Sequence, residues 1–129
     1  MIAVIFEAVV GQTEKAAYLA AAAALRPLLL QQEGFISIER FGSLTQPDKI
    51  LSLSFWRDEQ AVAAWRNAEA HRTIQAQGRE HIFSDYRLRV AAVLRDYGMN
   101  DRNEAPEDST EITGQPSSDH NAIGKCTDR

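Results

Sequence analysis

Apolar residues alternate along the first ten positions of the chain, which is the spacing of a β-strand. From Ile2 to Val10 both alternating sets are mostly apolar, so we predict a strand buried on two faces. The same two-residue period returns from Phe35 to Ser43 and from Ile50 to Trp56. Between these two segments lies Gln46-Pro47-Asp48, a sequence typical of a tight turn. The two segments are therefore expected to pair as an antiparallel hairpin.

Helix signals separate the predicted strands. Thr13 is placed to cap an alanine-rich helix that runs to about Gln32, and Gly34 fits the C-terminal stop of that helix. Asp58 is a good N-cap for a second helix, which we expect to break near Asn67 before it continues.

Tyr86 to Asp96 alternates again and completes a β-α-β-β-α-β order. That order predicts an α+β fold of the ferredoxin-like type, with an antiparallel four-stranded sheet and both helices on one face. We assign residues 1–98 to this domain. Residues 99–129 are polar and acidic with almost no aliphatic side chains, so we expect a disordered C-terminal tail.

The other face of such a sheet would be apolar here, because strands 2–10 and 50–56 carry apolar residues on both sides. A second copy of the chain is the simplest cover for that face, so we expect a homodimer.

Composition narrows the class of protein. Seven acidic and three basic residues lie from Met99 onward, which accounts for the whole net charge of −4 and leaves residues 1–98 neutral. The absence of net charge on residues 1–98 argues against nucleic-acid binding.

Cys126 is the only cysteine, so neither an internal disulfide nor a cysteine-rich metal site is expected. Without a signal peptide or a membrane-spanning run, a soluble cytoplasmic protein is expected.

Candidate site residues cluster between positions 52 and 97. Trp65 is either a core side chain or the wall of a pocket that stacks on an aromatic ligand. His71, Gln75 and Gly78 share one helix face and could line a cavity, or mark a half-buried histidine near a helix end.

Two charged residues on predicted strands remain open at this stage. Arg87 either binds a ligand oxygen or pairs with an acid such as Glu39 or Glu7. Glu7 is either a base with a raised pKa or the partner of an arginine.

Four motifs together resemble the antibiotic biosynthesis monooxygenase domain family over about residues 1–98. They are a strand-ending SxSFW, a DExAxxxW helix, HRxxQxxGR and a final YRxRV strand. The resemblance implies a dimeric α/β barrel, with two sheets face to face and a pocket between sheet and helices in each subunit. It also implies that Trp65 lines the pocket and that Arg87 helps to bind an anionic substrate. Ala61 stands where an asparagine is expected in the cofactor-free enzymes, so this chain lacks the amide that activates the substrate in them.

Some relatives in this family degrade heme, and the same comparison disfavours heme here. Their iron-ligating histidine corresponds to Gln75, and their first-strand asparagine has no counterpart at Phe6 or Glu7. His71 lies one turn earlier and would need a different heme orientation. We therefore expect neither a cofactor nor a metal.

The resulting hypothesis is a cofactor-independent monooxygenase acting on a small aromatic, phenolic or quinone-type compound. Trp65 would stack on the substrate beside Gln75 and Gly78, His71 would handle a proton and Arg87 would stabilise charge. Two alternatives are a heme-binding or heme-degrading relative, and a non-catalytic dimeric protein that binds small molecules or responds to stress.

Overall fold

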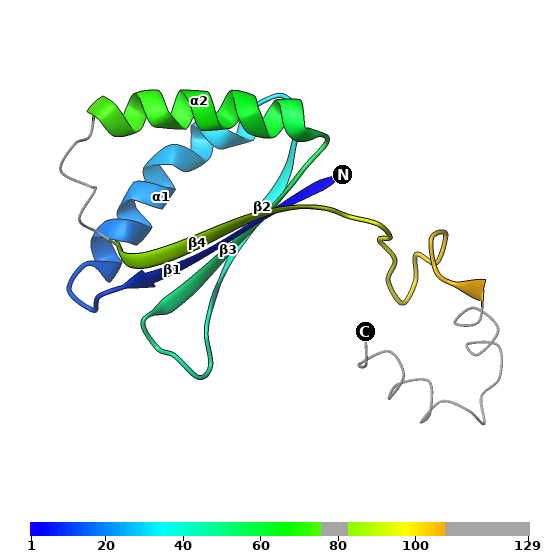
Figure 1. Cartoon of the computed structure of the whole chain (residues 1–129), viewed down its shortest axis with the longest axis horizontal. Helices are drawn as coiled ribbons and strands as arrows, with labels where there is room; N and C mark the ends of the chain where they lie inside the picture. Colours follow the sequence, from blue (N-terminus) through cyan, green and yellow to red (C-terminus); the bar gives the residue numbers. More distant parts are fainter. Residues whose placement is uncertain (76–82, 108–129) are drawn as a thin grey trace. The chain divides into compact units, whose positions relative to one another are not determined.

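The computed structural model describes residues 1–75 and 83–107, and the side chains of 69–75 lie outside that description. The predicted β-α-β-β-α-β order is confirmed (Figure 1). The elements are β1 (Ile2–Val10), α1 (Lys15–Leu30), β2 (Phe35–Gly42), β3 (Lys49–Trp56), α2 (Glu59–Gln75) and β4 (Phe83–Ala92).

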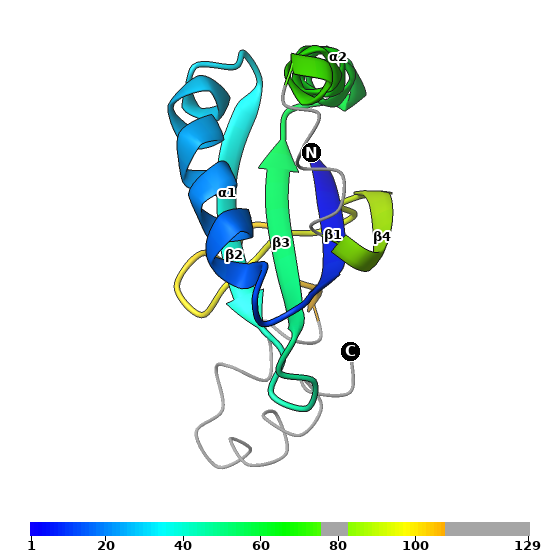
Figure 2. The same cartoon turned by 90° about the vertical axis from the view of Figure 1, so that its left-hand side faces the viewer.

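The four strands form one antiparallel sheet in the order β2-β3-β1-β4, seen side by side in Figure 2. β1 is a central strand, paired with β3 along one edge and with β4 along the other. One of its faces, with Val4 and Phe6, is turned toward the helices. Both helices lie on the same side of the sheet (Figure 1). The ferredoxin-like α+β fold predicted from the sequence is therefore confirmed.

The start of α2 follows the sequence signal closely. The backbone N–H of Ala61 donates a hydrogen bond of 2.9 Å to Asp58 Oδ1, as expected of an N-cap. This hydrogen bond, followed by the Arg57 guanidinium, lowers the pKa of the Asp58 carboxyl. The predicted break near Asn67 is wrong, because α2 continues to Gln75. Residues 59–75 contain no glycine or proline, so nothing interrupts the helical hydrogen bonds.

The predicted cap of α1 is also wrong. Glu14 is the N-cap residue, and its side chain makes no capping hydrogen bond. The Thr13 hydroxyl donates to Glu14 Oε2 at 2.6 Å instead, so it does not reach the free N–H groups of the helix. The predicted stop at Gly34 is wrong, because α1 ends at Leu30 with Gln31 as its C-cap. Gly34 lies in the turn into β2, where its φ is 84°, a region that favours glycine.

β2 departs from simple alternation at its start. Phe35 is paired with Trp56, and Ser37 with the next residue, Phe55, so Ile36 is an extra residue in a bulge. Ile36 is therefore 53% exposed. Phe35 turns into the core, where its ring meets Trp56 edge-on at 5.3 Å between centroids. The regular two-residue period predicted from Phe35 to Ser43 would place Phe35 on the same side as Ser37, and the bulge is the reason for the difference.

β4 ends at Ala92, earlier than the predicted Asp96, and the chain divides into the units 1–92 and 93–129. Within the second unit, Gly98 N–H donates to the Asp101 carbonyl at 2.8 Å and the Arg102 guanidinium lies 5.3 Å from the Tyr97 ring centroid. Residues 108–129 lie outside the described residues, so the disordered tail at 99–129 and the domain limit at 98 stay predictions. No described helix is long and apolar enough to cross a membrane.

Candidate functional site

The core between the sheet and the helices is divided into two clusters. One contains Tyr18 with Ala8, Val10 and Ile50, and the other contains Leu29 with Trp56 and Ala61. Tyr18 and Leu29 lie near opposite ends of α1 and both are buried on its inner face. The middle of the helix thus spans the gap between the two clusters.

Small side chains leave that gap unfilled. Between Tyr18 and Leu29, the inner face of α1 carries Ala21 and Ala22, and the sheet below carries the hydroxyl-bearing side chains Ser52 and Ser54 of β3. The result is a cavity of about 330 Å³ lined by both helices and all four strands. Ligand pockets in proteins run from roughly 300 to 1,000 Å³, so the cavity is large enough for a small organic molecule.

Aromatic side chains make up much of the cavity wall. Trp56 and Trp65 lie with ring centroids 6.4 Å apart and planes 32° from parallel. The indole N–H of Trp56 donates to Ser54 Oγ at 2.9 Å, which fixes the orientation of that ring. Trp65 is half-buried and lines the cavity, as the pocket-wall interpretation of this residue requires. Its contact with a substrate stays a prediction.

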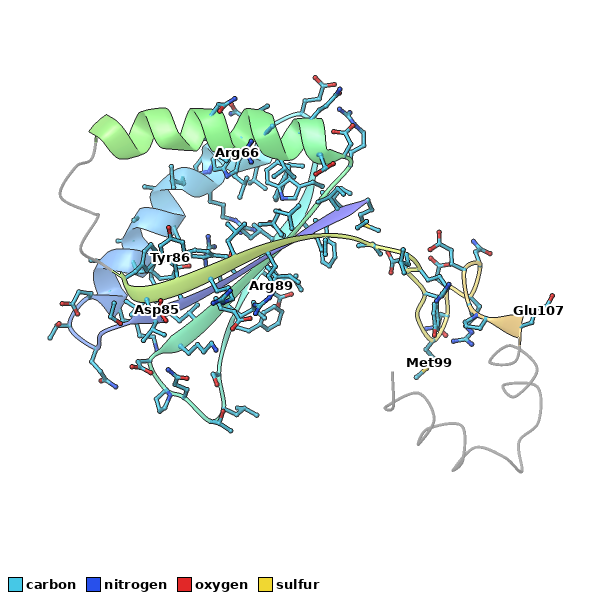
Figure 3. All side chains as sticks on the ribbon, in the orientation of Figure 1. Arg66, Asp85, Tyr86, Arg89, Met99 and Glu107 are labelled. Carbon is cyan, nitrogen blue, oxygen red and sulfur yellow. The ribbon has the colours of Figure 1, made fainter. Side chains whose placement is uncertain are left out.

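The charged side chains on the described wall are all cationic. Arg26 of α1, Arg40 of β2 and Arg66 of α2 line the cavity, and no described aspartate or glutamate does. Figure 3 shows Arg66 on the side of α2 that faces the sheet. Arg40 is half-buried, and its Nε–H donates to the Tyr18 hydroxyl at 3.4 Å. The described part of the cavity wall is therefore mostly apolar, and the charges on it are all positive.

Three of the predicted site residues cannot be placed against this cavity. His71 and Gln75 belong to α2, but their side chains lie outside the described part of the chain, and Gly78 lies outside the described residues altogether. Their roles stay predictions.

Arg87 lies on the opposite face of the sheet from the cavity. Arg87 is exposed and lies opposite Glu7 in the register of β1 and β4. Its neighbour Leu88 lines the cavity. Alternate residues of a strand point to opposite faces, so Leu88 and Arg87 must separate in this way. The predicted convergence of Arg87 with Trp65 is therefore not found within one chain.

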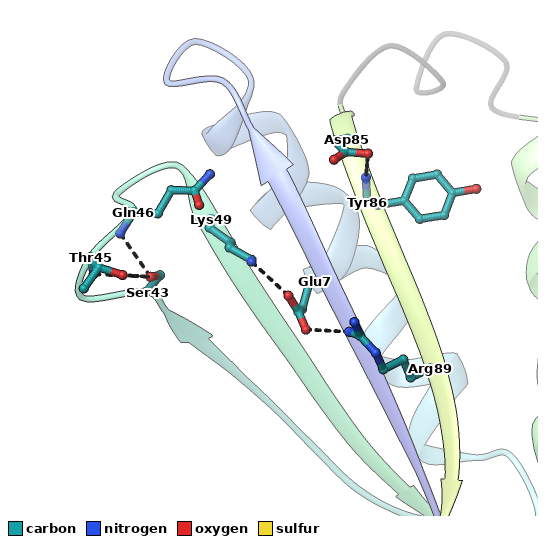
Figure 4. A network of polar contacts seen from close by, with 8 residues as sticks. All are labelled: Glu7, Ser43, Thr45, Gln46, Lys49, Asp85, Tyr86 and Arg89. Atoms are coloured by element: carbon teal, nitrogen blue, oxygen red, sulfur yellow. Dashed lines mark hydrogen bonds and ion pairs between the residues drawn. The ribbon is translucent and has the colours of Figure 1, made fainter.

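The open face of the sheet holds a charge cluster around Glu7 (Figure 4). Lys49 Nζ lies 2.9 Å from Glu7 Oε1, and Arg89 Nη1 lies 2.8 Å from Glu7 Oε2. The hydrogen bond and charge of Lys49, with a smaller contribution from Arg89, lower the pKa of the Glu7 carboxyl. The alternative of Glu7 as a base with a raised pKa is wrong, and its pairing with an arginine is confirmed for Arg89.

The sequence analysis missed the residues that create and charge the cavity. Arg40 occupies an inward position of β2, two residues after Ile38, where an aliphatic side chain would be typical. Ala21 and Ala22 follow Tyr18 at the three- and four-residue spacing of a core face. A polar residue at a core position and alanines where larger side chains would pack were the available signals. No group of three or more described His, Cys, Asp or Glu side chains is arranged to hold a metal ion.

The fold and the cavity define a class: a ferredoxin-like α+β domain with a space of ligand size between its sheet and its helices. Residues 1–77 match the family model described as antibiotic biosynthesis monooxygenase, and the chain belongs to this family.

A relative from Pyricularia oryzae, named jasmonate monooxygenase ABM, is 43% identical over 101 residues. The match covers 78% of this chain and 47% of the relative, so the chain spans about half the length of that protein.

Solved structures agree on the fold. A Deinococcus radiodurans protein assigned to the antibiotic biosynthesis monooxygenases superposes with a TM-score of 0.65 at 14% identity, over 77% of this chain and 98% of its own. A Mycobacterium tuberculosis protein superposes with a TM-score of 0.63 at 18% identity, over 75% and 98% of the two chains. At these identities the structural likeness shows the fold alone.

Proposed function

We propose that this protein is a monooxygenase that binds a small aromatic, phenolic or quinone-type compound in the cavity and oxidises it with O₂ without a cofactor. Membership of the monooxygenase family supports the reaction type. The single observation that carries the choice of site is the cavity between the two core clusters, with Trp65 on its wall.

The geometry suggests how the chain's own groups would contribute. Trp65 offers a flat surface on which an aromatic substrate can stack. The apolar wall excludes water, and the guanidinium groups favour the ionised, electron-rich form of the substrate. An ionised phenol can pass an electron directly to O₂. One oxygen atom then enters the ring as a carbonyl oxygen and the other leaves as water, and all four electrons come from the ring, which ends as a quinone. His71 is proposed to take or share the phenolic proton.

The Pyricularia oryzae relative offers a second compound to test. Its name assigns it to jasmonate. Because the present chain spans about half of that protein, jasmonate is included here as a candidate substrate for this cavity. It has no phenol ring, so oxidation with O₂ alone would have to convert a CH₂ group to a carbonyl and release water, with all four electrons coming from jasmonate itself.

O₂ uptake by the purified protein, measured with hydroquinones, simple phenols and jasmonate, tests the proposal. We expect turnover above the uncatalysed rate with at least one compound. Ala22→Leu fills the cavity and should abolish turnover, whereas Ala24→Leu, the same change at an exposed position of α1, should not. His71→Ala should reduce turnover by about a hundredfold. No turnover with any compound would remove the enzyme hypothesis, and an active Ala22→Leu variant would show that the cavity is not the site.

Heme binding is the main alternative, and a titration separates the two. Gln75 occupies the expected ligand position, so we expect no sharp Soret band. A one-to-one heme complex that His71→Ala abolishes would favour the heme-degrading relatives instead.

We also propose that two copies pair through the open face of the sheet and that the protein acts in the cytoplasm. The face carries the half-buried side chains of Ile5, Leu51 and Leu53 and the 42% exposed Phe41. An apolar patch of this kind on a sheet is typical of a subunit interface.

A further inference from the structure

Arg40 is the charged residue on the cavity wall whose inward, half-buried position is unusual for an arginine. It lies in the middle of β2 on the inward face, directly across from Ser52 of β3. Arg26 and Arg66 also line the cavity, but both are exposed, whereas Arg40 is half-buried. None of the ion pairs formed among the described residues includes Arg40. A guanidinium held against an apolar cavity without a carboxylate is costly, and that cost falls when an anion binds.

Two hydroxyl groups lie beside this guanidinium. The Tyr18 hydroxyl accepts the Arg40 Nε–H at 3.4 Å, so its own proton remains available for another acceptor. Ser52 is buried, and its side chain lies on the cavity side of the strand that pairs with β2. The remaining N–H groups of Arg40 and these two O–H groups are all donors, which is the set that a carboxylate accepts.

We propose that Arg40, Tyr18 and Ser52 form an anion subsite, and that the cavity takes an amphipathic organic anion: a carboxylate attached to an apolar or aromatic body. The carboxylate binds at Arg40, and the apolar body lies along Trp56 and Trp65. This inference rests on the proposed function for the use of the cavity and adds a carboxylate on the substrate, a group that a simple phenol or quinone does not carry.

The chain contains its own reporter for this site. Its two tryptophans, Trp56 and Trp65, both line the cavity, so intrinsic fluorescence responds to an occupant. The full chain is titrated at neutral pH with phenylbutyrate and with phenylbutanol, which share an apolar body and differ in the carboxylate. We expect phenylbutyrate to bind at least about tenfold more tightly, as charge-assisted hydrogen bonds allow.

Variants locate the preference on Arg40. Arg40→Gln should remove the preference for the acid while phenylbutanol still binds, and Arg40→Lys should retain part of it because the charge remains. Tyr18→Phe should weaken acid binding several-fold by removing one donor. Arg57→Gln is the matched control, since Arg57 is an exposed arginine outside the cavity that pairs with Glu33 and Asp58. Thermal melts show that each variant is folded, and Arg40→Lys and Tyr18→Phe carry the test if Arg40→Gln is not.

Three results would overturn the inference. They are equal affinity for the acid and the alcohol, an undiminished preference in a folded Arg40→Gln variant, and inorganic phosphate binding as tightly as phenylbutyrate. The failure of this inference can be distinguished from the failure of the proposed function. Acid-selective binding without any O₂ uptake removes the oxygenase and leaves the anion subsite, whereas turnover of neutral phenols without acid selectivity removes only the subsite.

Discussion

At the scale of single residues, Glu7 shows how a carboxyl on a central strand is accommodated. Its neighbours on the same face of the sheet are Lys49 from β3 and Arg89 from β4, one on each side (Figure 4). Both cations favour the ionised carboxylate and lower its pKa below the ordinary value of 4.5, with Lys49 the larger cause. Glu7 therefore joins β1 electrostatically to β3 and β4 rather than acting as a base.

The sign of the pH effect follows from that lowered pKa. The stabilising contribution of Glu7 is fully present above pH 4.5 and is lost as the pH falls through the lower pKa of the folded state. We expect Glu7→Gln to be less stable than the wild type at neutral pH and to lose less stability on acidification. Urea unfolding at neutral and acidic pH measures both.

Glu39→Gln is the control for Glu7, because Glu39 lies on the same face and forms no ion pair with a described residue. Identical acid profiles for the wild type and Glu7→Gln would contradict the assigned role.

Ser54 has a defined structural role inside the cavity. It is 6% exposed and accepts the indole N–H of Trp56, which is 2% exposed. Ser54→Ala leaves that buried donor without its acceptor, so we expect a loss of about 1–3 kcal/mol in the free energy of unfolding. Chemical denaturation measures the loss. Ser52→Ala, two residues earlier on the same face, should cost less, and equal losses would show that the hydrogen bond to Trp56 is not the cause.

At the scale of elements, the junction between α1 and β2 depends on one glycine. Gly34 has a φ of 84°, and its carbonyl accepts the Arg57 N–H at 2.7 Å, which ties the end of α1 to the end of β3. A Cβ at this position would lie 2.5 Å from the Cβ of Ala61. Both the backbone conformation and the close approach of α2 therefore require glycine here.

Gly34→Ala should destabilise the fold by about 1–2 kcal/mol from the left-handed backbone alone, with the contact to Ala61 adding to it. Gly42→Ala provides the comparison, because no atom lies within 4 Å of a Cβ at that position. Thermal unfolding of both variants measures the difference. If Gly34→Ala melts at the same temperature as Gly42→Ala, the close packing of α2 on this turn is not real.

Both helices were expected from the sequence, but their ends were not equally well predicted. Asp58 could be recognised because an N-cap acts locally, through a hydrogen bond to a residue three positions on. The bulge at Ile36 could not, since it depends on which residue of β3 faces Phe35. The Asp58 cap was therefore readable from the chain, although the equally local cap predicted at Thr13 was wrong because its hydroxyl bonds Glu14 instead. Register, in contrast, is a property of two strands.

At the scale of the whole molecule, the sheet has two apolar faces and two helices that cover one of them. When one face of an antiparallel sheet is open to water, the residues on that face are typically polar. On the uncovered face, Phe41 is 42% exposed and lies in register with Leu51. Members of this family are typically dimeric, which fits the cover that the sequence predicted.

Light scattering at micromolar concentration should report twice the chain mass of 14.4 kDa. Phe41→Asp should shift the protein toward the monomer, because it places a charge in the proposed apolar interface. Leu44→Asp is the matched control, since Leu44 is fully exposed in the turn between β2 and β3. A wild-type protein that remains monomeric at this concentration would exclude the proposed interface.

The sequence by itself determined the number, type and order of the elements and the family, because alternation, capping and motif spacing are local properties of the chain. It also identified Trp65 as a candidate for the pocket wall. The tertiary structure decided which face of β4 meets the helices, and so turned Leu88 inward and Arg87 outward. It also decided where the core is hollow, because a cavity is a gap between side chains from six elements. Arg40 and Tyr18 meet at that gap although they are 22 positions apart in the sequence, and only the packing of α1 across the sheet brings them together.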